Sequence, residues 1–285
     1  MFDGVMLLWF LLTALSLSFV VVDIRATPAS PVLKWGFSLL TAYTGPLGAF
    51  LYVLGCREPL PGLHERYVAT RWRQVLGSTM HCVAGDGVGI LAGAVIASIF
   101  HLPKVIDIVL EYALGFGFGW SIFQALFMRE QAGGSYKRAL SSTFFPELLS
   151  MNFLMAGMVP VMTLAMKSTP ESHDPLGPAF WFIMSMALLV GFITAYPING
   201  WLVSRHMKHG MITVRPPNGS VNGGASKSMH DNHTASERTG SVEPKSKPVN
   251  GDVKLVSNSV LSRMTILSFL VFALGLSIAI IFGGL

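Results

Sequence analysis

The stretch MHCVAGDGVGILAGAVIASIFHL, residues 80–102, decides the fold class of this 285-residue chain. It contains no Lys or Arg and is longer than the ~20 residues that an α-helix needs to cross the hydrocarbon core of a bilayer. The whole chain has 12% charged residues, against roughly 25% in an ordinary soluble domain, and its mean hydropathy is +0.56. This composition excludes most soluble folds and indicates apolar surface that faces lipid.

Six further apolar windows of similar length accompany this stretch. Together they predict an all-α polytopic transmembrane helical bundle of six to seven spans, with seven as the preferred count and a lipid bilayer as its surroundings. Of the 20 Lys and Arg residues only Lys34 falls inside a window, two residues after its start, as expected because a charge at the membrane centre costs about 3 kcal/mol. The predicted spans are residues 5–22, 32–55, 80–102, 105–128, 148–166, 178–203 and 264–285.

The basic residues are divided unevenly among the connections between these windows. With seven spans, alternate connections carry 16 and 4 of the 20 Lys and Arg residues. The positive-inside rule assigns the more basic set to the cytoplasm. The sequence therefore predicts a multi-pass protein of the cell (inner) membrane with a cytoplasmic N-terminus.

The last connection differs in composition from the rest of the chain. Residues 205–262 are rich in Ser, Asn, Gly and charged residues and poor in large apolar ones, so burial cannot offset the entropy of ordering them. We expect a disordered cytoplasmic linker between a membrane bundle, residues 1–204, and a C-terminal transmembrane helix, residues 263–285. No aromatic residues alternate with the linker's charges, so its basic character indicates contact with water or anionic lipid and no nucleic-acid partner.

The stretch that decides the fold also carries unusual polar residues. Cys82 and Asp86 share a helix face because they lie four residues apart. If the helix begins at residue 80, Asp86 lies about 9 Å deep and needs a partner or an aqueous cavity. The neighbouring face has a small-residue pattern that favours close helix packing: Gly85, Gly89 and Gly93.

Sulfur and imidazole groups near the same boundary suggest a soft-metal cofactor such as copper. Cys56 ends the second predicted span at the boundary where Cys82 begins the third. Thiolate, thioether and imidazole ligands together suit Cu(I) or Zn(II), although both cysteines can equally be small buried apolar side chains. The candidate ligands are Met80, His81, Cys82 and Cys56.

Further polar residues in the spans suggest an ion pathway. An acid near each end of the bundle is what a proton- or cation-coupled pathway needs, and it is also what two unrelated packing sites would show. Glu147 leads a methionine stripe, which favours adaptable packing over a path for soft cations, and Pro197 predicts a kink or break in the sixth span. The pathway candidates are Asp86, Glu111, Gln124, Glu147, Asn152 and Asn199.

Two segments resemble an uncharacterised family: MHCVAGD, residues 80–86, and YPINGWLV, residues 196–203, with KHGM at 208–211. The family consists of prokaryotic multi-pass membrane proteins with a domain of unknown function, and the H-C-x-x-G-D segment carries the resemblance. It covers roughly Arg71 to Met211 and implies a shared membrane fold. Some of its relatives look associated with copper proteins, and the family provides no catalytic residue.

Two function classes remain from the sequence. The phosphate-binding, zinc-hydrolase and serine-hydrolase motifs are absent from the chain, so the sequence does not predict an enzyme. The favoured reading is a transporter or permease for a small ion or metal cation. The alternative is a metal-binding or accessory membrane protein without transport activity, and an oligomer or a complex with a partner membrane protein fits either reading.

Overall fold

The computed structural model describes residues 2–129, 134–211 and 257–284. Within these ranges the chain is helical and contains no strand, which confirms the all-α prediction. The α-helices are α1 (Phe2–Asp23), α2 (Pro31–Thr44), α3 (Pro46–Gly55), α4 (His64–Val68), α5 (Arg71–Ile99), α6 (Lys104–Phe118), α7 (Ala125–Arg129), α8 (Tyr136–Ser168), α9 (Pro178–Ser204) and α10 (Asn258–Ile278). Two π-helical segments, η1 (Gly119–Gln124) and η3 (Ala279–Gly283), and a 3₁₀ turn, η2 (Pro170–His173), complete the order.

Six helical segments of the described chain are long and apolar enough to cross a membrane. They are α1, α5, α6 with η1 and α7, α8, α9, and α10 with η3. Most of the predicted windows are therefore confirmed as helices, although α5 and α8 begin nine and twelve residues earlier than expected, at Arg71 and Tyr136. Of the kink or break expected at Pro197, the break is wrong, because α9 continues through this residue to Ser204.

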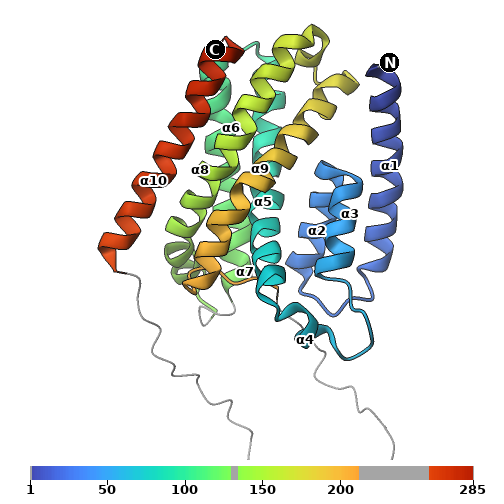
Figure 1. The fold of residues 1–285 in the computed structure, drawn as a ribbon, viewed down its shortest axis with the longest axis vertical. Coiled ribbons are helices and arrows are strands. Elements are labelled where there is room, and N and C mark those ends of the chain that lie inside the picture. Colours follow the sequence, from blue (N-terminus) through green and yellow to red (C-terminus); the bar gives the residue numbers. More distant parts are fainter. Residues whose placement is uncertain (1, 130–133, 212–256, 285) are drawn as a thin grey trace, which may run out of the picture. The chain divides into compact units, whose positions relative to one another are not determined.

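The predicted span 32–55 forms two short helices in place of one long helix. Gly45 ends α2 with φ +59°, a conformation that favours glycine, and Pro46 begins α3. At 1.5 Å per residue the two helices are about 21 Å and 15 Å long, too short for a ~30 Å hydrocarbon core. They lie side by side as a hairpin against α1 (Figure 1). The count of long helices in the described part of the chain is therefore six, the lower limit of the expected range.

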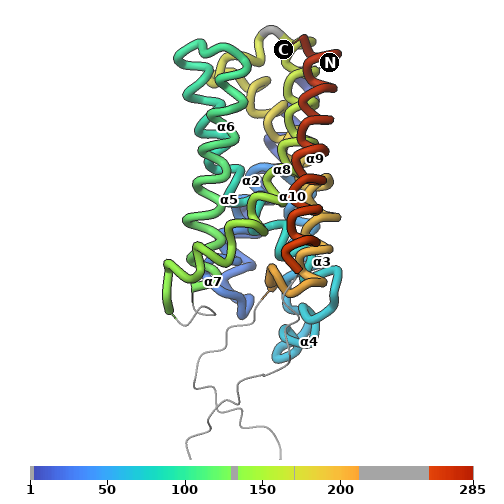
Figure 2. Tube along the Cα trace, turned by 90° about the vertical axis from the view of Figure 1, so that its left-hand side faces the viewer, coloured from blue at the N-terminus to red at the C-terminus, as the bar shows by residue number. Residues whose placement is uncertain are grey.

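The α2–α3 hairpin changes which connections share an end of the bundle. Because it returns to the end from which it started, the first and last residues of the described chain lie at the same end of the helices (Figures 1 and 2). Among the described residues, all Lys and Arg except Lys104 and Lys167 lie in or beside the connections at the opposite end, which includes α4.

The core lies where α5, α8 and α9 pack together. The methionine stripe of α8 is part of this core, with Met151, Met155 and Met158 fully buried, as the packing interpretation expected. On the other side of α5, Gly89 and Gly93 lie directly against the backbone of α6. The predicted small-residue pattern therefore brings α5 and α6 into close contact.

The predicted linker lies partly outside the described residues. Residues 212–256 are not described, and α10 begins at Asn258, six residues before the expected span. Residues 205–211 do not belong to a linker in structural terms, because they fold back against α5. Gln74 Nε2 donates hydrogen bonds to Met211 O at 3.1 Å and to Val68 O at 2.7 Å, which holds this segment in place.

Candidate functional site

Two buried carboxyl groups lie in the interior of the helical bundle. Because α5 begins at Arg71, Asp86 lies about 22 Å from the start of the helix and about 20 Å from its end, which corrects the expected depth of about 9 Å. Glu147 lies about 16 Å inside α8 and not at its edge. Both side chains are 0% exposed.

The two carboxyl groups converge on Gly119, the first residue of the π-helical segment η1. A Cβ at this position would overlap Asp86 Oδ1 and would lie 2.9 Å from Glu147 Oε1. Both oxygens are therefore within 3 Å of one point, and at most about 6 Å apart. A π-helical turn widens the helix and occurs often at functional sites. Here it presents a glycine where any larger residue would displace the acids.

A lysine that the sequence analysis did not select reaches Glu147 from the basic end of the bundle. Lys208 Nζ donates to Glu147 Oε2 at 2.8 Å and to Ser150 Oγ at 2.8 Å, and it contacts Cys82 Sγ. The side chains of Lys208 and Glu147 are 3% and 0% exposed. This ion pair is therefore almost completely removed from water, which is where losing either partner is most costly.

The turn after α9 places this lysine. His206 adopts a left-handed conformation with φ +56°, and its N–H donates to Val203 O at 3.1 Å. The next N–H, that of Met207, donates to Leu202 O at 3.0 Å. These are the two hydrogen bonds of a Schellman motif, which ends a helix and reverses the chain. The reversal directs Lys208 back between α5 and α8.

Polar side chains from α5, η1, α8 and α9 complete the surroundings of the ion pair. Asn199 Oδ1 accepts from Ser78 Oγ at 3.2 Å and from Ser150 Oγ at 3.1 Å. Cys82 Sγ accepts from Gln124 Nε2 at 3.3 Å and donates to Glu147 Oε2 at 3.3 Å. We call the set Asp86, Glu147, Lys208, Cys82, Gln124, Ser150 and Asn199 the acid–lysine cluster.

The charges of the acid–lysine cluster do not balance when both acids are ionised. Lys208 supplies one positive charge, whereas Asp86 and Glu147 supply two negative ones, and each of the three side chains is buried. Asp86 Oδ1, Asp86 Oδ2 and Glu147 Oε1 have no hydrogen-bond donor among the described residues. An unpaired buried carboxylate costs several kcal/mol, so the cluster requires a proton or another cation at this point.

The other predicted pathway acid lies nearer the opposite end of the bundle. Glu111 is fully buried in α6, and neither of its carboxyl oxygens has a donor among the described residues. It lies eight residues, or about 12 Å along the helix axis, from Gly119. The structure therefore places buried acids at two depths and does not join them in one cluster.

Asn152 belongs to a separate contact between helices. Its Oδ1 accepts from Tyr112 Oη of α6 at 2.7 Å, and its Nδ2 donates to Ser268 Oγ of α10 at 2.9 Å. The side-chain oxygen and nitrogen of Asn152 therefore both have partners on neighbouring helices. This arrangement ties α6, α8 and α10 together and lies apart from the acid–lysine cluster.

The predicted soft-metal ligands do not gather in the described part of the chain. Met80 packs toward Gly36 of α2, Cys56 follows the end of α3, and Cys82 faces Lys208. His81 is buried against the ring of Phe127, with ring centroids 4.1 Å apart. No group of three or more His, Cys, Asp or Glu side chains among residues 2–129, 134–211 and 257–284 is placed to hold a metal ion.

Sequence reasoning missed Lys208 and Gly119 for different reasons. Lys208 follows the last apolar residue of α9 and resembles an ordinary interfacial lysine, and only the Schellman turn at His206 brings it inside. Gly119 is the last of three alternating glycines, after Gly115 and Gly117, and nothing in the sequence of this run distinguishes the glycine that faces the acids.

Comparison with known proteins gives a match to one family model, and the matched residues include this cluster. No curated protein and no solved structure matches the chain. Residues 71–208 match the family model of DUF4396, a domain of unknown function, as the resemblance over roughly residues 71–211 predicted. The matched region begins with α5 and ends at Lys208, so it contains every member of the acid–lysine cluster.

Proposed function

We propose that this multi-pass membrane protein moves a small cation across the membrane through the acid–lysine cluster. The observation that carries the proposal is the charge imbalance at Gly119: two buried carboxyl groups face one another there, and Lys208 compensates only one of them. Ionisable groups inside a membrane bundle are rare and usually mark ion or proton pathways. A proton is the simplest cation that satisfies this geometry, because two adjacent carboxyl groups can share it in a hydrogen bond.

Lys208 acts in this proposal as a tethered cation that competes with the transported one. Its amine neutralises Glu147 while the segment 205–211 is packed against α5. If this segment moved away, both carboxylates would be left without compensation and would attract a cation from the basic end of the bundle. Return of Lys208 would then weaken the binding of that cation and favour its release, which is how differential binding drives a conformational cycle.

Glu111 is the second acid of the proposed path. It lies about 12 Å from Gly119 toward the end of the bundle that carries Lys104 and Lys167. That distance exceeds a direct hydrogen bond, so a proton passing between Asp86 and Glu111 would need intervening water. The tight contact between Gly93 and the Glu111 backbone keeps this part of the path narrow in the state described.

The α2–α3 hairpin also leads us to propose a different orientation from the one expected with seven spans. All described Lys and Arg residues except Lys104 and Lys167 lie at the end of the bundle opposite to the chain's first and last described residues. The positive-inside rule assigns this basic end to the cytoplasm. Both chain ends would then lie on the outer side, and Lys208 would face the cytoplasm.

Cation flux into liposomes tests the proposed function. The purified protein is reconstituted with a pH-sensitive dye inside, and a potassium gradient with valinomycin supplies the driving voltage. Separate runs offer Na⁺, K⁺, Mn²⁺ or Zn²⁺ with ion-selective indicators. We expect wild-type protein to carry protons or one of these cations and the variant Asp86→Asn to lose at least ~90% of the flux, because it removes the uncompensated carboxylate.

A matched control separates this loss from damage to the protein. Asp3→Asn removes an exposed acid at the start of α1 and is expected to keep wild-type flux. Equal flux in the wild type and in Asp86→Asn would refute the role of the cluster. Absence of flux for every cation, together with co-purification of a partner complex, would favour the accessory alternative.

A further inference from the structure

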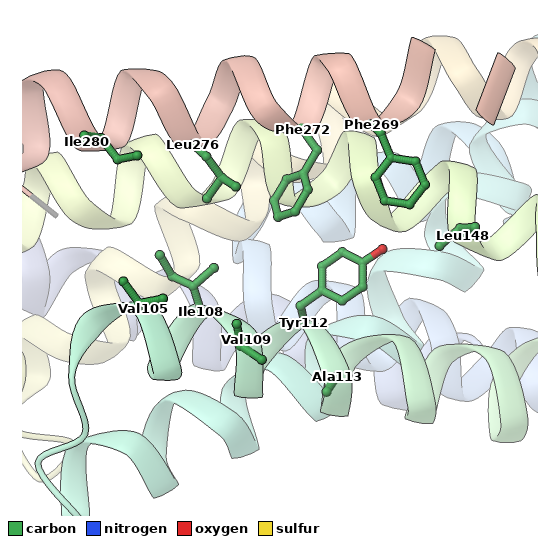
Figure 3. A pocket seen from close by; sticks show the side chains of 10 residues that line it. All are labelled: Val105, Ile108, Val109, Tyr112, Ala113, Leu148, Phe269, Phe272, Leu276 and Ile280. Carbon is green, nitrogen blue, oxygen red and sulfur yellow. The ribbon is translucent and has the colours of Figure 1, made fainter. Parts of the chain in front are cut away.

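A long apolar groove runs between α6 and the C-terminal helix, over the surface of α8 (Figure 3). Its volume is about 640 Å³. Val105 and Val109 of α6 and Ile280 of η3 are more than half exposed, so the groove opens sideways where a membrane protein meets lipid. The complete lining is Val105, Ile108, Val109, Tyr112, Ala113, Leu148, Phe269, Phe272, Leu276 and Ile280.

The dimensions of the groove match one leaflet of a bilayer. From Phe269 to Ile280 its wall extends about 16 Å along the helix, and half of a ~30 Å hydrocarbon core is about 15 Å. The one hydroxyl in the lining, that of Tyr112, is already bonded to Asn152. The ring of Phe272 lies 5.4 Å from the ring of Tyr112, and these two side chains face one another across the groove (Figure 3).

The packing of α10 explains why the groove exists. Along its length α10 packs on α8, and Gly275 lies directly against the backbone of Ala156. Such close contact holds α10 against α8 and leaves the side facing α6 uncovered. Within a bilayer an apolar space of this size is filled by hydrocarbon, because neither water nor vacuum is favourable there.

Two lysines lie at one mouth of the groove. Lys104 precedes the lining residue Val105, and its Nζ donates to Gly284 O at 3.4 Å. Lys167 Nζ donates to Phe282 O at 3.0 Å. Neither lysine pairs with an acidic side chain among the described residues. Within residues 2–129, 134–211 and 257–284 they are also the two Lys or Arg residues absent from the opposite end of the bundle, so their positive charge is concentrated at this mouth.

The geometry points to a binding site for an anionic phospholipid. One acyl chain lies in the groove between α6 and α10, and the phosphate of the headgroup lies at Lys104 and Lys167. The apolar lining accounts for retention of the acyl chain, and the two lysines account for a preference for negatively charged headgroups. The bound lipid fills the gap beside α10 and fixes its position relative to α6.

Native mass spectrometry of the full chain tests this site. The protein is exchanged into detergent containing equal amounts of dioleoyl phosphatidylglycerol and dioleoyl phosphatidylcholine, and the lipids that remain bound are counted. We expect one tightly retained phospholipid with a preference for phosphatidylglycerol. In the double variant Lys104→Gln/Lys167→Gln the preference for phosphatidylglycerol is expected to fall about fivefold for each lysine removed. The double variant Lys104→Arg/Lys167→Arg is expected to keep the preference.

Variants that fill the groove test the acyl-chain site separately. Val109→Trp and Leu276→Trp are expected to lower retention of both lipids about tenfold. This is the loss expected when the indole ring keeps about two CH₂ groups of the acyl chain out of the groove. The controls are Val5→Trp, at a lipid-exposed position of α1, and Lys137→Gln, at the basic end, and both keep wild-type binding. Unchanged retention in the tryptophan variants would overturn the proposal.

Two further results would also overturn it. Inorganic phosphate that displaces the lipid at millimolar concentration would show a free anion site without an acyl chain. A protein dimer in detergent that the tryptophan variants dissociate would show that a second copy covers the groove.

Discussion

Removing the amine of Lys208 is expected to destabilise the protein strongly, because Glu147 then has no cation beside it. The pair is 3% and 0% exposed, with Nζ and Oε2 2.8 Å apart, so water cannot replace the lost partner without penetrating the bundle. Breaking a buried ion pair by removing one partner costs about 3–5 kcal/mol. For a domain of this size that corresponds to a decrease in Tm of roughly 6–20 °C.

A double-mutant cycle separates the ion pair from other effects of the substitution. Lys208→Gln, Glu147→Gln and the double variant are compared with wild type by intrinsic fluorescence during heating in detergent. The double variant removes both charges and keeps polar side chains, so we expect it to be more stable than Lys208→Gln by about 1–3 kcal/mol. The exposed Lys137→Gln serves as a control with unchanged Tm. A wild-type Tm for Lys208→Gln, or strictly additive effects in the cycle, would refute the reasoning.

Three other predictions follow from the same contacts. Gly119→Ala is expected to cost about 1–3 kcal/mol in thermal unfolding because its Cβ would overlap Asp86, whereas Gly117→Ala, which meets nothing within 4 Å, is expected to change nothing. Reporter enzymes fused to the first and last residues are expected to give outer-side signals at both ends; signals from opposite sides would contradict the hairpin, and cytoplasmic signals at both ends would contradict the orientation. His206→Gly is expected to raise Tm by one to a few degrees, because glycine adopts the left-handed turn without strain; a lower Tm would show that the imidazole has another role.

The helical membrane fold could be predicted from the sequence because its main signal is local. An apolar run without Lys or Arg must form a helix in lipid, where every backbone polar group needs a partner within its own segment. The same reasoning identified Asp86, since an acid inside an apolar run is costly wherever it lies, and it noted Glu147 at the edge of the next predicted span but one. The spacing of Gly85, Gly89 and Gly93 also predicted a close helix contact, which forms between α5 and α6.

Features that depend on a chain reversal could not be predicted. Hydropathy averages residues 32–55 as one apolar segment and does not detect the turn at Gly45 and Pro46 that divides it. The orientation depends on that turn, because one more or one fewer crossing exchanges the two sides of the membrane for every later helix. Helix starts were also misplaced, since α5 and α8 continue beyond their apolar runs into polar residues at Arg71 and Tyr136.

The acidic and polar side chains of the site could be predicted from the sequence, whereas its positive charge could not. Asp86, Cys82, Gln124 and Asn199 were candidates from their residue types in apolar windows, and Glu147 was a candidate because it directly precedes one. Lys208 lies outside every window, in a segment whose basic character fits a membrane surface equally well. A tertiary contact across 61 residues, from Glu147 to Lys208, leaves no periodic signal in a single sequence.

Infrared difference spectroscopy of the carboxyl groups tests the central claim most directly, namely that Asp86 and Glu147 hold one exchangeable cation beside Lys208. At neutral pH the account predicts a carbonyl band of a buried protonated carboxyl group in the wild type. This band shifts in D₂O, loses intensity when a transported metal cation replaces the proton, and is weaker in Asp86→Asn, in which only the contribution of the buried Glu111 remains. A band of equal intensity in Asp86→Asn, or a wild-type protein in which neither a proton nor a metal cation occupies the pair, would contradict the account.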